Sequence, residues 1–427
     1  MQVAVTRAKA YLKVRHKAVR DAMKELKLDV LLLTHPPDLA YLTNFTGDDS
    51  VGLITEKDFH LVTDFRYQEQ AELEAGWLKV TMRENKMSEA IGKTLAAAKA
   101  KRVGYEANFT TVGQVNALQQ ELKNGKQAVE LVPLENVMTN IRKVKDDHEI
   151  DLIRKSVGVA EEAFEAIAEE IKVGQTENYL AGLLVFELRS RGASNSSFPV
   201  IVAAGANSSL PHYRPGETLV QRDQPLLIDW GALYKGYCSD LTRTLMVGRV
   251  SPKMKQIYKV VLEAQQAAIK FLRPGVTTTQ ADRVARDVID EAGFGKYFGH
   301  GLGHGIGRDI HELPTLRKTG GEEELRPGVT TQQADRVARD VIDNAGFKDQ
   351  FGHGLGHGIG REIHELPSMR KLGGEEELRP GMIVTVEPGI YLPGEGGVRI
   401  EDDVLITHSG CEVLSSLDKS FEGCHIE

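Results

Sequence analysis

The stretch LLIDWGALYKGYCSDLTRTL (residues 226–245) holds the pattern that decides the fold of the larger part of this chain. Two apolar, strand-like runs flank a glycine-containing turn, which predicts a β-hairpin. Asp229 and Asp240 are symmetric about the turn centre between Tyr234 and Lys235, so we expect their side chains to face each other across the two strands. Two carboxylates so placed repel each other unless a cation lies between them. Alone, the pair is equally well explained as two solvated aspartates on an exposed hairpin.

A second hairpin favours a cation site over two solvated aspartates. In MIVTVEPGIYLPGEGGVRIEDDVLIT (382–407), Glu387 and Glu401 are symmetric about Gly394 in a glycine-rich turn and should also face each other. Glu387 lies in a strongly apolar strand, where an ionised carboxylate is costly to bury without a metal or a charged partner. Two hairpins with facing carboxylates therefore predict one shared cation site.

The segment FGHGLGHGIG, at 298–307 and again at 351–360, supplies histidines. In an extended strand, His353 and His357 lie on one face, while the alternating glycines let another backbone approach closely. Glycine-rich phosphate loops follow other patterns, and plain core histidines are the remaining alternative. His364 comes seven residues after His357, so both reach one site only if the chain bends between them.

An internal repeat is the most unusual feature of the sequence. Residues 272–324 recur as 325–377 with 44 of 53 positions identical, and a third LRPG begins at Leu378. Two copies are too few for a solenoid, so we interpret the block as a tandem duplication inside one domain.

The first 140 residues have a different pattern of expected helices and strands. An amphipathic helix is expected over 5–27 and a buried strand over 28–34 that stops before Pro36 and Pro37. The alternation that follows indicates an α/β domain with a boundary near 140. Strands are expected near 51–54, 59–63 and 102–105, and helices near 66–75 and 87–100. After the boundary, a helix is expected to begin within 140–155 and to run to about 171, and further helices are expected over 176–191, 252–271 and 281–289.

Composition narrows the class of protein. The 427 residues allow two or three domains, and the net charge of −8 argues against nucleic acid or an anionic membrane as the main partner. Three cysteines, which we interpret as free thiols, fit a reducing compartment. The N-terminus has no apolar signal core, and no 18 apolar residues run together, so we expect a cytoplasmic enzyme.

The order Asp229, Asp240, histidine, Glu387, Glu401 resembles the five-ligand metal site of the aminopeptidase P and prolidase family, Xaa-Pro peptidases with the pita-bread fold. The motifs DWGALYKGYCSDLTRT, HGLGHGIG, TVEPGIY and GVRIEDD look like that family too. This resemblance implies an α+β protein, with an N-terminal α/β creatinase-like domain (1–140) followed by a catalytic pita-bread domain (141–427).

The resemblance also implies the roles of the ligands. Two divalent metal ions, Mn²⁺ foremost with Co²⁺ or Zn²⁺ as alternatives, would be bridged by Asp240 and Glu401 and would hold a bridging hydroxide. Asp229 would bind one ion, and His357 and Glu387 the other, with Glu387 also acting as proton shuttle.

Further site residues come from the same motifs. His212, in the proline-flanked loop SSLPHYRPG, would more often be a surface histidine if it stood alone, but with His353 and His364 it matches the family's pocket histidines. Tyr391 and Arg399 also match, and Arg399 is expected to orient Glu401 or Asp229.

The duplication departs from the family, which has one glycine–histidine segment here. We hypothesise that copy two is used, because His357 keeps the short connection to the Glu387 strand. In the rival arrangement, His300, His304 and His311 of copy one fill the site.

The implied function is hydrolysis of the peptide bond between an N-terminal residue and proline, by a homodimer acting on peptides with proline in second position. Aminopeptidase and dipeptidase activity both remain open. The alternatives are a methionine aminopeptidase, a creatinase-like hydrolase, a metal-free pita-bread binding protein and an inactive duplicated variant.

Overall fold

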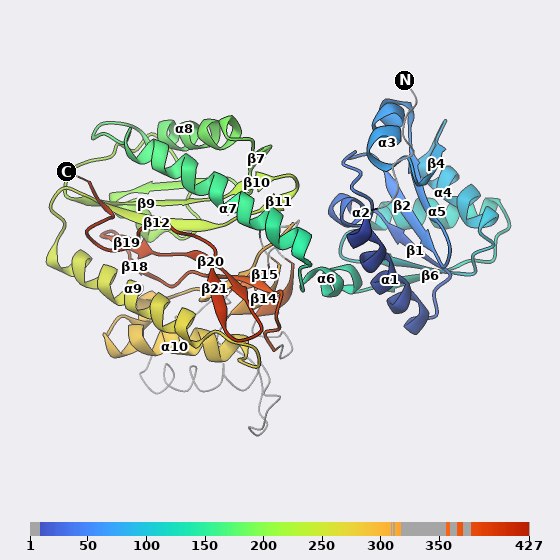
Figure 1. Cartoon of the computed structure of the whole chain (residues 1–427). Coiled ribbons are helices and arrows are strands. Elements are labelled where there is room, and N and C mark those ends of the chain that lie inside the picture. The colour runs from blue at the N-terminus through green and yellow to red at the C-terminus, as the bar shows by residue number, and fades with distance from the viewer. Residues whose placement is uncertain are drawn as a thin grey trace. The chain divides into compact units, whose positions relative to one another are not determined.

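The computed structural model describes residues 9–308, 310, 312–316, 356–358, 365–369 and 377–426. The chain divides into two compact units, Met1–Ile141 and Arg142–Glu427, each with its own hydrophobic core (Figure 1). Among the described residues, no helix combines the length and the apolar character needed to cross a membrane.

The N-terminal unit is built on a six-stranded sheet in the order β4-β3-β2-β1-β5-β6. Strands β1, β5 and β6 are parallel, whereas β1, β2 and β3 pair antiparallel. The strands are β1 Val30–Leu33, β2 Val51–Thr55, β3 Phe59–Thr63, β4 Lys79–Met82, β5 Arg102–Glu106 and β6 Glu130–Leu134. The helices are α1 Ala10–Glu25, α2 Pro36–Thr43, η1 Phe65–Tyr67, α3 Gln68–Ala75, α4 Met87–Ala97, α5 Val112–Asn124 and α6 Val137–Arg142.

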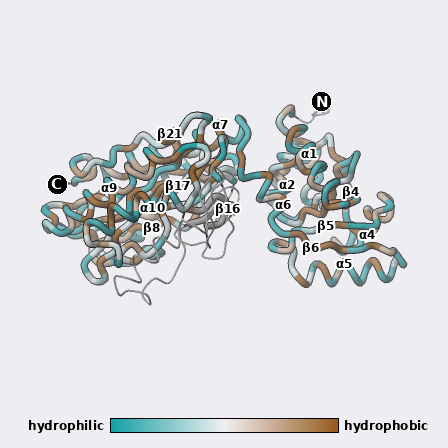
Figure 2. Tube along the Cα trace, turned by 90° about the horizontal axis from the view of Figure 1, so that it is seen from below, coloured by the Kyte–Doolittle hydropathy of each residue, from teal (hydrophilic) through white to brown (hydrophobic). Residues whose placement is uncertain are grey.

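Strand β1 is central because both of its faces are buried, as expected for a continuously apolar run. Leu31 and Leu33 contribute to a core with α1, α2 and α3, while Val30 and Leu32 contribute to a second core with α4 and α5. The surrounding helices alternate between hydrophilic and hydrophobic residues along the trace (Figure 2). The result is an α/β/α arrangement, which confirms the predicted class of this unit.

The prolines after β1 do more than end a strand. Pro36 and Pro37 occupy the first turn of α2, where a missing backbone N–H is harmless and the fixed φ suits a helix. The sequence analysis did not predict this helix, nor β4, α5 and β6.

The C-terminal unit places α7 and α8 on one side of its strands and α9 and α10 on the other (Figure 1). Its helices are α7 Asp147–Ala168, α8 Glu177–Ser190, η2 Gly205–Ser209, α9 Pro252–Phe271, α10 Thr278–Glu291 and η3 Gly295–Tyr297. Its first strands are β7 Asn195–Ser196, β8 Ile201–Ala204, β9 Gln224–Trp230, β10 Ala232–Tyr234, β11 Tyr237–Cys238, β12 Leu241–Val247, β13 Gly303–Gly305 and β14 Glu312–Leu316. The later strands are β15 Gly356–Gly358, β16 Glu365–Met369, β17 Ile383–Val386, β18 Gly389–Leu392, β19 Gly396–Arg399, β20 Asp402–Ile406, β21 Cys411–Val413 and β22 His425–Ile426.

Two sheets carry the candidate site. One has four strands in the order β22-β12-β9-β8, and the other has seven in the order β16-β15-β14-β13-β17-β20-β21. Two smaller sheets, β11-β10-β7 and β18-β19, extend the hairpins. The two repeat copies meet where β14 pairs parallel with β15.

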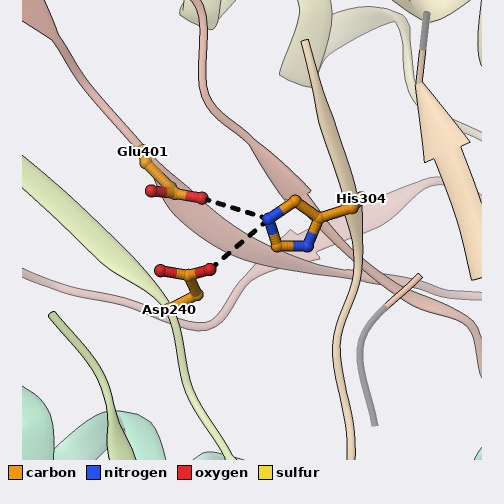
Figure 3. Close-up of side chains that lie close together, drawn as sticks. All are labelled: Asp240, His304 and Glu401. Atoms are coloured by element: carbon orange, nitrogen blue, oxygen red, sulfur yellow. Dashed lines mark ion pairs between the residues drawn. The ribbon is translucent and has the colours of Figure 1, made fainter. Parts of the chain in front are cut away.

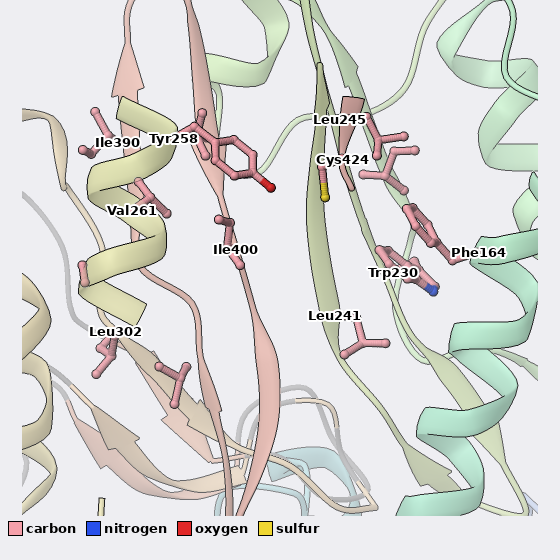
Figure 4. Close-up of a cluster of buried hydrophobic side chains, with 14 of the residues drawn as sticks. Phe164, Trp230, Leu241, Leu245, Tyr258, Val261, Leu302, Ile390, Ile400 and Cys424 are labelled. Carbon is pink, nitrogen blue, oxygen red and sulfur yellow. The ribbon is translucent and has the colours of Figure 1, made fainter. Parts of the chain in front are cut away.

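The hydrophobic core packs the central strands between α7 and α8 on one side and α9 and α10 on the other (Figure 4). On one side Phe164 of α7 stacks on Trp230 of β9, with ring centroids 4.4 Å apart and an interplanar angle of 12°. The Trp230 indole N–H donates to the carbonyl of Ala160 at 2.9 Å. On the other side Tyr258 and Val261 of α9 are buried in the same cluster. Strands fixed on both faces form a rigid platform for functional side chains.

Candidate metal centre

The first hairpin carries two buried aspartates. Asp229 lies in β9, and Asp240 immediately precedes β12. The predicted direct opposition of the two is wrong, because the partner of Asp229 is Thr242. The chain turns about Lys235 and Gly236, which have left-handed φ of 49° and 77°, so the turn centre moves along by one residue. The pairing then shifts by two residues, an even shift that keeps both carboxylates on one face, where they interact.

The second hairpin has the predicted register. The strand pairs on either side of Glu387 and Glu401 are symmetric about Gly394, which has φ 77°. Thr242 joins the two hairpins, because its Oγ1 donates to Glu401 Oε2 at 2.6 Å and its carbonyl accepts the Glu401 N–H at 3.1 Å. Since Thr242 also pairs with Asp229, the four carboxylates converge from two hairpins.

His304 of the first repeat copy completes the cluster (Figure 3). Its Nε2 lies 3.4 Å from Asp240 Oδ2, 3.3 Å from Glu387 Oε1 and 3.9 Å from Glu401 Oε1. Asp240, His304 and Glu401 are buried, and one ligand atom from each lies within 4.8 Å of the others. Ligand atoms that lie about 2.1 Å from one ion are roughly 3–4 Å from each other, so these distances suit side chains that share a cation.

Glycine allows His304 to reach this position. Strand β13 pairs antiparallel with β17, and the His304 N–H donates to Thr385 Oγ1 at 2.6 Å. A Cβ atom on Gly303 would lie only 1.9 Å from the Thr385 carbonyl oxygen. The close backbone approach expected of the alternating glycines is therefore confirmed for copy one.

The carboxylates share a strongly unfavourable electrostatic environment. Burial is the main cause that raises the pKa of Asp240 and of Glu387 well above the ordinary value, and the charge of Glu401 adds to both shifts. Burial, together with the charge of Asp229, raises the pKa of Glu401 to about 8. Such groups stay ionised only if positive charge is brought among them.

The residues present fit a divalent metal ion. Oδ1 of Asp229, Oδ1 of Asp240 and Oε1 of Glu401 are buried and have no hydrogen-bond partner in the described part of the chain. Unpaired buried carboxylate oxygens are expensive, and metal coordination is a common way to satisfy them. Oxygen ligands with one imidazole favour a hard or borderline divalent ion.

The structure seats copy one, and not copy two, beside Glu387. Strand β13 neighbours β17, whereas β15, which contains His357, is separated from β13 by β14. Neighbouring strands are about 4.8 Å apart, so β15 lies roughly 10 Å from the position hypothesised for it. Copy one follows α9 directly and contains α10, which packs against α9, so the first histidine segment meets the site first along the chain. His304 thus holds the place given to His357, whose side chain lies outside the described residues.

Comparison with known proteins identifies this arrangement. The model of metallopeptidase family M24 matches residues 151–326 and 319–408, and that of the Creatinase/Prolidase N-terminal domain matches residues 15–144. The chain belongs to metallopeptidase family M24. It is therefore an enzyme of the hydrolase class, with the creatinase-type N-terminal domain and pita-bread catalytic domain expected from the sequence.

Individual relatives cover nearly the whole chain. An uncharacterised peptidase of Bacillus subtilis is 33% identical over 94% of this chain and 97% of its own length. A Xaa-Pro dipeptidase of Pyrococcus horikoshii is 30% identical over the same shares, 94% and 97%. Among solved structures, the Xaa-Pro dipeptidase from Bacillus anthracis has a TM-score of 0.79 at 34% identity and covers 96% of this chain and 99% of its own. The X-Pro aminopeptidase from Thermotoga maritima has a TM-score of 0.76 at 30% identity, covering 95% and 99%.

Arg399 links the carboxylate cluster to Tyr391 and, through its hydroxyl, to His300 of copy one. Its guanidinium donates to Asp229 Oδ2, to Thr242 Oγ1 at 3.1 Å and to the Tyr391 hydroxyl at 2.9 Å. The Tyr391 hydroxyl also lies 2.6 Å from Nε2 of His300. Of the two carboxylates that the sequence offered to Arg399, the guanidinium thus contacts Asp229.

Of the remaining predicted histidines, the structure describes His212 alone. His212 is exposed in the loop after η2, next to Pro211, whose carbonyl accepts from Arg399 Nη1 at 3.4 Å. His353, His364 and His311 lie outside the described residues.

Two threonines of the site escaped sequence reasoning. Thr242 lies two residues after Asp240 in the strand pattern SDLTRT, so strand alternation already placed it on the carboxylate face. Thr385 stands two residues before Glu387 and carried the same signal. Threonine is common in strands, so neither hydroxyl stands out in the sequence as a group that supports a metal ligand.

Proposed function

We propose that this M24 enzyme hydrolyses the peptide bond between an N-terminal residue and a following proline, as a Xaa-Pro dipeptidase or Xaa-Pro aminopeptidase. The observation that carries the proposal is the convergence of Asp229, Asp240, Glu387 and Glu401 around His304. Relatives that match this chain over most of their length carry both names.

The donor set supports a centre of two divalent metal ions, Mn²⁺ first, with Co²⁺ and Zn²⁺ as the alternatives. Asp240 and Glu401 belong to different hairpins and each offers a ligand atom within 4.8 Å of the other and of His304, which suits bridging ligands. Asp229 would hold one ion, and Glu387 with His304 the other. When bound, the ions would make a bridging water acidic and stabilise the oxyanion that develops on the scissile carbonyl.

The side chains of the chain have separate tasks in this proposal. Glu387 is the most accessible of the carboxylates, with 17% of its side chain exposed, so it can pass a proton between the attacking water and the leaving proline nitrogen. Arg399 keeps Asp229 oriented toward the centre. His212 stands at the exposed side of the site, where it can donate to the substrate.

Purified protein loaded with Mn²⁺ tests the proposal. Bound metal should be measured by elemental analysis, and hydrolysis of Xaa-Pro dipeptides should be compared with that of Xaa-Pro-Yaa tripeptides. Turnover of the dipeptide alone would establish a dipeptidase, and turnover of the tripeptide an aminopeptidase. Absence of both metal and turnover would overturn the peptidase and leave the binding-protein or inactive-variant readings. Two control substrates test the other hydrolases. A methionyl peptide that contains no proline tests for a methionine aminopeptidase, and creatine tests for a creatinase-like hydrolase.

We also propose that the enzyme is a homodimer in the cytoplasm. The odd and sparse set of three cysteines, none of them in a disulfide, supports a reducing compartment. Sedimentation analysis of the metal-loaded protein measures the oligomeric state, and a monomer at micromolar concentration would contradict the dimer.

A further inference from the structure

A buried carboxylate outside the metal centre has no role in the chemistry so far. Glu177 is the first residue of α8 and is 0% exposed. Its Oε1 accepts from the Ala204 N–H at 2.8 Å and from the Asn207 amide at 2.9 Å. Its Oε2 accepts from the Tyr213 hydroxyl at 2.8 Å and from the Gly216 N–H at 3.1 Å. Four donors on one buried carboxylate make a strong and directional anchor.

These hydrogen bonds do not serve the helix that carries Glu177. The N-terminus of α8 is already capped by Thr176, whose Oγ1 accepts the Tyr179 N–H at 3.1 Å. The donors to Glu177 come instead from the two ends of residues 204–216, which we call the substrate loop. His212 stands in this loop, directly before Tyr213.

The substrate loop also docks on the strand that leads to the metal ligands. The Gly397 N–H donates to Ser208 Oγ at 2.8 Å, and a Cβ atom on Gly397 would lie 2.4 Å from the Ser208 carbonyl oxygen. Pro211 accepts from Arg399, which binds Asp229. The loop is therefore held by Glu177 on one side and by β19 on the other.

We infer that Glu177 is a positioning residue that fixes the loop carrying His212 beside Arg399 and so determines affinity for the substrate. This inference rests on the proposed Xaa-Pro peptidase function, in which His212 contacts the bound peptide. The carboxylate of Glu177 touches neither the metal ligands nor the reacting atoms, so its loss should act on substrate binding and leave metal binding intact.

The variant Glu177→Gln tests the inference with little change of shape. A carboxamide offers one acceptor oxygen, so two of the four donors lose their partner. We expect KM for an Xaa-Pro substrate to rise about tenfold, which corresponds to the loss of two buried hydrogen bonds, with kcat and bound metal near wild type. Glu187→Gln is the matched control, because Glu187 lies on the same helix and, within the described part of the chain, its carboxylate pairs with Arg191 just after the end of α8. Tyr213→Phe, which removes one donor, should give a smaller rise.

A double-mutant cycle with His212→Ala separates positioning from general stability. If Glu177 acts through His212, the change Glu177→Gln should alter KM little when His212 is already alanine. An equal rise in KM in both backgrounds, a loss of bound metal in Glu177→Gln, or an unchanged KM would each overturn the inference.

Amide hydrogen exchange provides a readout that does not depend on activity. The Ala204 and Gly216 amides should exchange faster in Glu177→Gln than in wild type or Glu187→Gln, because they lose an acceptor. If the wild type cleaves no Xaa-Pro peptide, the proposed function fails while this exchange still tests the anchor. If the wild type is active and exchange and KM are unchanged in Glu177→Gln, the positioning role fails alone.

Discussion

The two repeat copies have 44 of 53 residues in common, yet they lie at different places in the same sheet. Strand β13 of copy one pairs with β17 beside the carboxylates, whereas β15 of copy two pairs with β14 and β16, further out. Both strands carry the sequence Gly-His-Gly, so local propensity cannot explain the difference. The two copies differ in what precedes them, since copy one follows α9 and copy two follows copy one, and we expect this connection to select the histidine that reaches the metal centre.

The largest expected effect comes from removing one histidine at a time. His304→Ala should lower peptidase activity more than about 100-fold and release metal, because losing even an outer-shell partner of a metal costs 10–100-fold. His357→Ala should leave both near wild type, since β15 lies away from the carboxylates. Elemental analysis and turnover of an Xaa-Pro substrate measure the outcome. Loss in His357→Ala alone would restore the hypothesis that copy two fills the site.

Metal removal at different pH should give the next largest effect. The pKa of Glu401 in the folded, metal-free protein is about 8, raised by burial. A carboxyl whose pKa is raised on folding stabilises the fold fully below its ordinary pKa of about 4.5, and this contribution is lost as the pH rises through the raised value. The Tm of EDTA-treated protein should therefore fall between about pH 5 and about pH 9. The corresponding loss in the free energy of unfolding is about a few kcal/mol.

Added Mn²⁺ should reduce that fall, because it binds the deprotonated carboxylates. With Mn²⁺, His304→Ala should follow the metal-free curve, and His357→Ala should follow the wild type. Glu401→Gln should make the metal-free curve less steep without flattening it, because burial also raises the pKa of Asp240 and Glu387. A metal-free Tm that rises with pH would contradict the raised pKa.

A smaller effect is expected from the glycines that precede the two histidines. Gly303→Ala puts a Cβ atom 1.9 Å from the Thr385 carbonyl oxygen, so β13 must move away from β17. We expect a loss of about 1–3 kcal/mol in the free energy of unfolding, typical of overpacking, together with weaker metal binding. Gly356→Ala, at the equivalent position of copy two, is the matched control for denaturant unfolding. Equal losses in both variants would show that copy two packs against β17 as well.

Thr385→Val should have a milder effect than the glycine substitution. It keeps the shape of the side chain but removes the Oγ1 that accepts the buried His304 N–H. We expect a loss of about 1–2 kcal/mol and a modest fall in metal affinity, both measurable by titration and thermal unfolding. Unchanged metal affinity would mean that the carboxylates, and not β17, hold His304 in place.

The register of a hairpin could be predicted from sequence where glycine marks the centre of the turn. The register of Glu387 and Glu401 follows from the glycine-rich turn about Gly394, whose positive φ glycine adopts without strain. The other hairpin was misregistered because Lys235, a residue that rarely adopts positive φ, occupies the left-handed turn beside Gly236. Composition alone gives no signal for that choice.

Other features depended on tertiary contacts that a single sequence does not reveal. The four donors on Glu177 come from residues 27 to 39 positions further along the chain, so no local pattern marked it. The choice between His304 and His357 could not be predicted either, because the segment FGHGLGHGIG that contains each of them is identical in the two copies.

The smallest expected effect comes from deleting one whole copy. Deletion of 325–377 joins Glu324 to Leu378 and recreates the EEELRPG junction found at the end of both copies. Copy one keeps its pairing with β17, so metal content and turnover should stay at wild-type levels. Deletion of 272–324 instead joins Phe271 to Leu325 and recreates FLRPGV. Copy two then follows α9 directly, and His357 should take the place of His304 and restore an active centre. The second deletion gives copy two the chain position of copy one but keeps its nine differing residues, so an inactive second deletion beside an active first would show that these residues, and not the connection, select the copy.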